Sequence, residues 1–65
     1  MSKFLNKLKE YRRGKSLTVT ELSEKVKVSR DTIQDIEDGH MVPSTELAKK
    51  ISKSLDSEID EIFLS

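Results

Sequence analysis

The sequence predicts an all-α fold, and three observations lead to this class. Apolar residues recur at intervals of three and four along nearly the whole chain, as they do on the buried faces of amphipathic helices. The β-branched residues do not alternate with polar ones, as a half-buried strand would require. One proline and two glycines among 65 residues leave few interruptions. We therefore expect one small domain over residues 1–65, folded as a compact five-helix bundle.

Composition narrows the classes of function. The absence of cysteine from the sequence excludes a disulfide framework, a thiolate nucleophile and cysteine-based metal sites. No apolar run approaches the length of a membrane span and no signal-peptide pattern opens the sequence, so we expect a cytoplasmic protein. With one histidine and no glycine-rich phosphate loop, we expect no catalytic residue, no metal site and no cofactor.

The first helix is expected over residues 1–14. Its apolar residues follow helical spacing and would form one buried face. Gly14 can end the helix in the left-handed conformation that glycine adopts most readily. The residues of the apolar face are Phe4, Leu5, Leu8 and Tyr11.

Residues 18–39 predict two short helices joined by a tight turn, and the rest of the chain is organised around them. Thr18 and Glu21 stand at the spacing of a capping box and would begin the first of these helices. Ser29 is an N-cap candidate for the second helix, and Gly39 supplies its stop. The apolar residues that would bury this pair are Leu22, Val26, Ile33 and Ile36.

The second helix of the pair buries one thin stripe and presents a varied polar outer face. Such a helix, held by a helix set before it, is what reading the major groove of DNA requires. Arg30 can bond guanine in a bidentate pair, and an aspartate can accept a hydrogen bond from the amino group of cytosine. The expected base-reading residues are Ser29, Arg30, Asp31, Thr32, Gln34 and Asp35.

Phosphate contacts are expected on both sides of this reading face. The positive ends of the two helix dipoles would face phosphate oxygens. His40, in the loop after the second helix, is equally consistent with an ordinary surface residue and with a phosphate contact. The residues expected near phosphates are Lys15, Thr18, Val19, Thr20, His40, Ser44 and Thr45.

The last third of the chain predicts a longer helix followed by a short one. Ser44 is expected to cap the longer helix, whose core face comprises Leu47, Ala48, Ile51 and Leu55. Ser57 is expected to cap the short helix, with Asp60 at the capping-box position. The apolar residues of the short helix exceed what one such helix needs to close the core.

Residues 28–39 resemble the helix-turn-helix of phage-repressor and Cro-like regulators, the XRE family. That family's pattern is an apolar residue, Ser or Thr with polar neighbours, Ile, two variable residues, an apolar residue and Glu-Asn-Gly. It stands here as VSRDTIQDIEDG. The likeness extends to both sides and covers nearly the whole chain. It implies a fold of the lambda-repressor-like DNA-binding type.

Two departures from the family pattern bear on the motif. The family usually has glycine at the turn, where φ is positive, and this chain has Lys27, at a cost of ~1 kcal/mol. Asp38 replaces the usual asparagine, which the family uses near a phosphate. A carboxylate would repel that phosphate, so we expect this one contact to be lost or reoriented.

The resemblance implies a structural pair and an assembly contact. The family's arginine corresponds to Arg12 and pairs with the glutamate that corresponds to Glu37; a bidentate pair would fix the first helix to the end of the reading helix. The family's dimer contact corresponds to residues 57–65. Isologous pairing is therefore expected there, or else these side chains close the core of a single chain. The side chains expected in the dimer contact are Ile59, Phe63 and Leu64.

Together these features predict a sequence-specific transcriptional regulator, a repressor that binds an inverted-repeat operator as a dimer through the major groove. Its partners would be double-stranded DNA, a second copy of the chain and a protein effector, with no membrane partner. The protein would be encoded by a bacterium or a phage and associated with the nucleoid. The alternative is a protein-interaction module, coactivator-like or antitoxin-like. Zero net charge, together with Asp31 and Asp35 on the reading helix, gives that alternative more weight than is usual for the family, although DNA binding remains the leading prediction.

Overall fold

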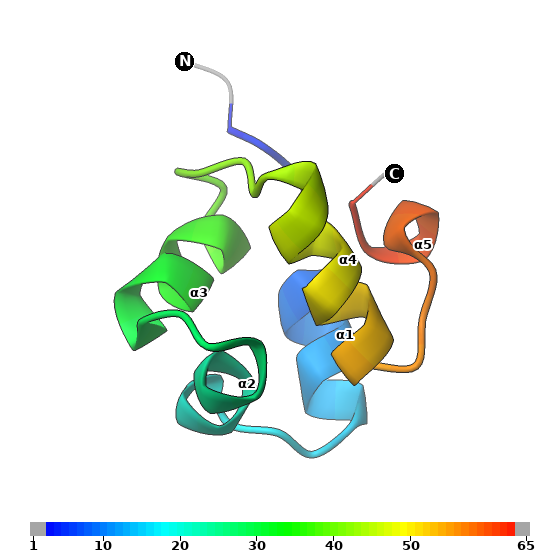
Figure 1. Cartoon of the computed structure of the whole chain (residues 1–65). Coiled ribbons are helices and arrows are strands. Elements are labelled where there is room, and N and C mark those ends of the chain that lie inside the picture. The colour runs from blue at the N-terminus through cyan, green and yellow to red at the C-terminus, as the bar shows by residue number, and fades with distance from the viewer. Residues whose placement is uncertain (1–2, 64–65) are drawn as a thin grey trace.

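The computed structural model describes residues 3–63, which form five helices and no strand (Figure 1). The helices are α1 (Leu8–Gly14), α2 (Val19–Val26), α3 (Arg30–Glu37), α4 (Thr45–Ser54) and α5 (Ile59–Phe63). In Figure 1, α2 and α3 lie on one side of the bundle, and α1, α4 and α5 lie on the other. The predicted all-α five-helix fold is confirmed. Within the described part, no helix has the length and apolarity to cross a membrane.

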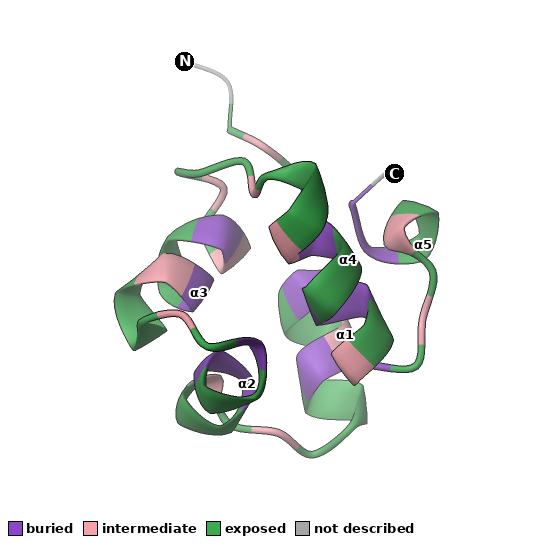
Figure 2. Cartoon of the chain, viewed as in Figure 1, coloured by how far each residue is buried: buried purple, intermediate pink, exposed green. Residues whose placement is uncertain are grey.

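One core joins all five helices. In Figure 2 the buried surfaces of the helices turn inward, and the outer surfaces of α2, α3 and α4 are exposed. Close packing of this core fixes where α3 lies relative to the rest of the bundle. The buried apolar residues are Leu8, Leu22, Val26, Ile33, Ile36, Ala48, Ile51, Leu55, Ile62 and Phe63.

Side-chain caps begin three of the helices at the predicted residues. At α2, the N–H of Glu21 donates to the Thr18 hydroxyl at 3.0 Å and the N–H of Thr18 donates to the Glu21 carboxylate at 2.8 Å. At α3 and α4, the hydroxyls of Ser29 and Ser44 each accept from the N–H three residues on, at 3.1 Å. These bonds satisfy N–H groups that have no carbonyl partner within the helix.

The prediction that the first helix starts at residue 1 was wrong, because α1 begins at Leu8. Residues 3–7, which we call the amino-terminal arm, have no regular secondary structure. Their polar groups bond elsewhere: the side-chain oxygen Oδ1 of Asn6 accepts from the N–H of Leu8, and the N–H of Lys7 donates to the Ile62 carbonyl at 2.7 Å. Leu5, expected on the buried face, is 74% exposed.

The expected left-handed cap at Gly14 was also wrong. Gly14 is the last residue of α1, and the left-handed conformation falls on Ser16, with φ of 58°. The turn that follows is closed by a bond from the N–H of Leu17 to the carbonyl of Arg12. At the turn between α2 and α3 the prediction is confirmed, because Lys27 has φ of 60°.

The predicted cap of the last helix was displaced. The helix begins at Ile59 rather than directly after Ser57, and the N–H of Glu58 donates to the side chain of Glu61 at 2.8 Å, which leaves no capping-box role for Asp60. Ser57 instead completes the end of α4, where its N–H donates to the carbonyl of Ser52 at 2.9 Å.

The side chains assigned to a dimer contact differ in exposure. Phe63 is only 6% exposed and its ring stacks on Phe4, with ring centroids 6.1 Å apart, so it helps to close the core of a single chain. Ile59 is half-buried and packs against the core edge. Leu64 lies outside the described residues. The dimer contact itself stays a prediction.

Candidate nucleic-acid interface

The outer face of α3 is polar and exposed, and its inner face is fully buried. Ile33 and Ile36 are 0% exposed, so the helix cannot rotate about its axis without exposing them. Figure 2 shows the opposite surface of α3 as exposed. The exposed predicted base-reading residues are Ser29, Arg30, Asp31, Gln34 and Asp35, and Thr32 is half-buried.

Two of these six residues, Ser29 and Thr32, use their hydroxyl groups in hydrogen bonds at the start of α3. The hydroxyls of Ser29 and Thr32 lie 2.8 Å apart and share a hydrogen bond, and the N–H of Thr32 also donates to Ser29. Gln34 and Asp38 are 3.5 Å apart, at the outer limit for a hydrogen bond. Arg30 is the one basic side chain of α3, and it is exposed at the first turn of the helix.

The start of α2 offers backbone donors beside α3. The N–H and hydroxyl of Thr18 are occupied by the capping box. The N–H groups of Val19 and Thr20 belong to the first turn, so they have no carbonyl acceptor within the helix. The backbone N–H of Thr18, and after it the Thr18 hydroxyl, hold the pKa of the Glu21 carboxyl below its ordinary value of 4.5. An anion at this end would therefore meet Val19 and Thr20 rather than Thr18.

The loop between α3 and α4 leaves the end of α3 that lies away from α2 (Figure 1). His40 is exposed at its start, and its N–H donates to the carbonyl of Asp35 at 2.9 Å. Ser44 uses its hydroxyl to cap α4, while Thr45 is exposed at the first helical position, where its N–H has no intrahelical acceptor. Two helix starts and one loop thus flank the outer face of α3.

Lys15 lies apart from this group. Its ammonium is 3.4 Å from the Asp56 carboxylate, in the connection between α4 and α5. In Figure 1 that connection lies on the opposite side of the bundle from α3. Both side chains are largely exposed, so the pair adds little to stability. The structure does not bring Lys15 together with the other residues expected near phosphates.

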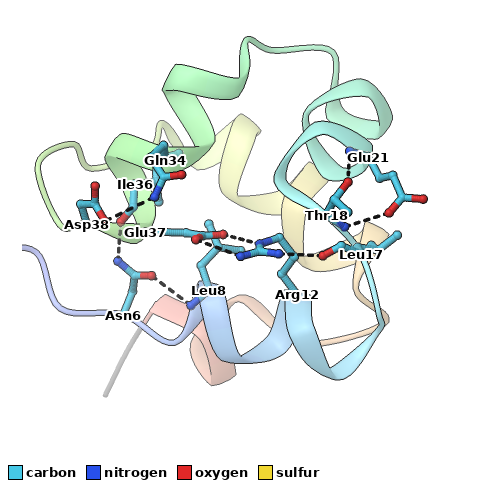
Figure 3. A network of polar contacts seen from close by, with 10 residues as sticks. All are labelled: Asn6, Leu8, Arg12, Leu17, Thr18, Glu21, Gln34, Ile36, Glu37 and Asp38. Atoms are coloured by element: carbon cyan, nitrogen blue, oxygen red, sulfur yellow. Dashed lines mark hydrogen bonds and ion pairs between the residues drawn. The ribbon is translucent and has the colours of Figure 1, made fainter.

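The predicted pair between Arg12 and Glu37 is confirmed (Figure 3). Arg12 Nε donates to one carboxylate oxygen at 2.6 Å and Nη2 donates to the other at 3.3 Å. The remaining nitrogen, Nη1, donates to the carbonyl of Leu17 at 2.7 Å. The Arg12 side chain is 10% exposed and that of Glu37 is 1% exposed. One guanidinium thus joins α1, the entry to α2 and the last residue of α3.

Sequence reasoning missed Asn6, which it placed inside a helix. The amide nitrogen of Asn6 donates to the carbonyl of Ile36 at 2.8 Å, near the end of α3 (Figure 3). Its oxygen accepts from the N–H of Leu8 at 3.0 Å. Asn6 stands one residue before the N-cap of α1, Lys7, and its distant partner is a backbone carbonyl, so the sequence carries no signal that could have found it.

Comparison with known proteins finds one family and several relatives. A family model described as helix-turn-helix matches residues 8–62. An HTH-type transcriptional regulator of Methanocaldococcus jannaschii is 48% identical over 59 residues, which cover 91% of this chain and 89% of that protein. The HTH-type transcriptional activator BcrR of Enterococcus faecalis is 42% identical over 60 residues, covering 92% of this chain but 29% of BcrR.

Two solved structures share the fold. The clp gene regulator ClgR from Corynebacterium glutamicum superposes with a TM-score of 0.79 at 28% identity, over 83% of this chain and 57% of that one. The master regulator for biofilm formation SinR, solved in complex with DNA, superposes with a TM-score of 0.76 at 31% identity. That match covers 82% of this chain and 86% of the SinR chain.

Proposed function

The chain belongs to the helix-turn-helix family of XRE-type transcriptional regulators, and on this premise we propose that it reads one operator sequence through the outer face of α3. The fold and the relatives make it a transcriptional regulator with a helix-turn-helix DNA-binding domain rather than a member of an enzyme class. The choice of residues, the operator symmetry and the mode of regulation are the proposed part.

The observation that carries the proposal is a reading helix whose inner face is fixed while its outer face is free. Ile33 and Ile36 are fully buried, and Glu37 at the helix end is held by Arg12. A helix fixed in this way can present side chains to base edges in one register. Preorganisation of this kind lowers the ordering cost of binding.

Each side chain of the reading face has a role set by its chemistry. Arg30 bonds the O6 and N7 atoms of a guanine in the major groove. Asp31 and Asp35 accept from cytosine amino groups and repel bases that present only acceptors. Gln34 can bond adenine, whereas Ser29 and Thr32 act mainly through the helix start.

Phosphates on either side are bound by backbone donors. The N–H groups of Val19 and Thr20 at the start of α2, and that of Thr45 at the start of α4, supply neutral contacts to the DNA backbone. His40 is exposed at the end of α3 and can add a side-chain contact. Backbone donors need no basic side chain, so a chain with zero net charge can still bind phosphate.

We further propose that two copies bind an inverted repeat, in the cytoplasm, and repress by occupying the operator. The assembly face is a shallow hollow of about 200 Å³ beside α5, next to the exposed side chain of Val42. A two-fold contact there would match a palindromic site. The hollow is lined by Phe4, Val42, Pro43, Thr45, Ala48, Ile59 and Phe63.

A protein-interaction role is the second candidate, because the outer face of α3 carries Asp31 and Asp35 against a single arginine. Salt dependence separates the two. A DNA reader loses affinity as salt rises, since each cationic group that neutralises a phosphate releases counterions, whereas an apolar protein contact does not.

The direct test is selection of bound duplexes from a random pool, followed by titration of the winning sequence at several salt concentrations. The proposal predicts an inverted repeat and a linear fall of log affinity with log salt, of modest slope because most of the phosphate contacts come from neutral backbone donors. A pool that shows no enrichment after repeated rounds would contradict it and favour the protein-interaction role.

A further inference from the structure

We propose that the amino-terminal arm, residues 3–7, sets the position of the carboxyl-terminal end of α3, with Asn6 as the positioning residue. The inference deepens the proposed DNA-reading function and rests on it. The arm is not part of the helix-turn-helix itself.

The amide of Asn6 uses both its nitrogen and its oxygen inside the fold. Its nitrogen donates to the carbonyl of Ile36 at 2.8 Å and to that of Phe4 at 3.1 Å. Its oxygen accepts from the N–H of Leu8 at 3.0 Å. A planar amide held at both ends has little freedom, so the bond fixes Ile36 relative to the start of α1.

A second contact lies one turn further, where α3 stops. The N–H of Phe4 donates to the carbonyl of Gly39 at 3.0 Å. A Cβ atom at Gly39 would lie 2.9 Å from the Phe4 carbonyl oxygen and 3.0 Å from the Lys3 Cβ. The backbone of the arm therefore packs directly on Gly39, just after the end of α3, and only glycine permits this approach.

The other side of the arm is joined to α5. The Phe4 ring stacks on Phe63 with an angle of 15° between the planes, and the N–H of Lys7 donates to the carbonyl of Ile62 at 2.7 Å. The arm thus bridges α5 and the end of α3. An eight-residue helix is only about 12 Å long, so a shift at one end changes the direction of every base-reading side chain.

The test uses Asn6→Asp on a duplex that carries one half of the selected operator, so that assembly does not enter the measurement. Aspartate keeps the oxygen that accepts from Leu8, but it loses the donor to Ile36 and sets a carboxylate oxygen against that carbonyl. We expect about a tenfold loss of affinity for the half-site, as when one base contact is weakened. Affinity for a scrambled duplex should fall much less.

Leu5→Ala is the matched control, because Leu5 belongs to the same arm and is 74% exposed. It should change neither affinity. Urea midpoints of each variant separate stability from positioning, since a purely structural role lowers the midpoint without changing the ratio of the two affinities. If Asn6→Asp were unfolded, Asn6→Ser would replace it, because serine can still accept from Leu8 but is too short to reach Ile36.

The outcomes are distinct. A folded Asn6→Asp or Asn6→Ser variant that keeps the wild-type ratio of half-site to scrambled affinity overturns this inference and leaves the proposed function intact. A wild-type chain with no preference for the half-site overturns the proposed function, and this inference with it.

Discussion

At the scale of single residues, two polar side chains hold the end of α3 and only one was predictable. Arg12 and Glu37 are a charged pair at positions that match a family pattern, so the sequence indicates their contact. Asn6 bonds a backbone carbonyl 30 positions away. A carbonyl is present at every residue, so such a bond leaves no pattern in the sequence.

The Arg12–Glu37 pair should couple strongly in unfolding. Replacing Arg12 by methionine leaves the Glu37 carboxylate, which is 1% exposed, without a partner and should cost roughly 3–5 kcal/mol. Glu37→Leu should cost a similar amount, and the double variant much less than the sum. Urea unfolding in the presence of a stabilising osmolyte measures all three. Additive losses would show that the two groups do not interact.

Glu21 should contribute a pH-dependent part of stability. Hydrogen bonds from Thr18 hold its folded pKa below 4.5, so the folded state binds fewer protons than the unfolded state in this region. The contribution is present above pH 4.5 and is lost as pH falls through the lowered pKa. Glu21→Gln keeps an acceptor that cannot ionise. Its urea midpoint should lie below that of the wild type at neutral pH and converge with it in acid; a constant difference would contradict this.

At the scale of the helices, the first residue of a helix was predicted correctly where a local side-chain cap sets it, and wrongly where no such cap does. The starts of α2, α3 and α4 are set by local caps at Thr18, Ser29 and Ser44, and the sequence located each one. α1 has no side-chain bond at its N-cap, Lys7, and α5 begins only after Ser57 has completed the end of α4. The start of α1 depends on distant partners of Asn6 and Lys7, and that of α5 on the use of Ser57 at the end of α4, so the cap patterns misplaced both.

A single substitution in the turn between α2 and α3 should raise the free energy of unfolding. Lys27 has φ of 60°, where a side chain costs ~1 kcal/mol relative to glycine. Lys27→Gly should therefore raise the free energy of unfolding by about 0.5–1 kcal/mol. Gly39→Ala is the contrasting variant and should destabilise, because its φ is 80° and its Cβ would meet the arm. Urea midpoints that fall for Lys27→Gly would contradict this reading of the turn.

At the scale of the whole molecule, the structure shows two distinct surfaces whose positions relative to one another could not be predicted from the sequence. The reading face lies over α3, and the apolar hollow lies beside α5 and the loop before α4. Sequence reasoning assigned the apolar excess to the last helix alone. Phe63 instead packs in the core of its own chain, and Val42, which lies far from the last helix in the sequence, is 66% exposed.

Val42→Glu should weaken self-association without unfolding the chain. The side chain is 66% exposed, so the carboxylate stays solvated in a monomer but would be buried unpaired in the proposed dimer. Sedimentation should show a shift toward monomer, and binding to the full operator should become more strongly concentration-dependent. Val42→Thr, of nearly equal size, is the control. A Val42→Glu protein that assembles as well as the wild type would place the contact elsewhere.

Titration of Arg30→Ala on the selected operator and on a scrambled duplex tests the claim that the outer face of α3 reads DNA sequence. Arg30 is the only basic side chain of α3, and losing its bidentate base contact should cost about 1–3 kcal/mol on the operator and little on the scrambled duplex. Lys53→Ala removes the same charge from the exposed surface of α4 and should affect both duplexes alike and weakly. Equal losses for Arg30→Ala on both duplexes, or no loss on either, would contradict the claim.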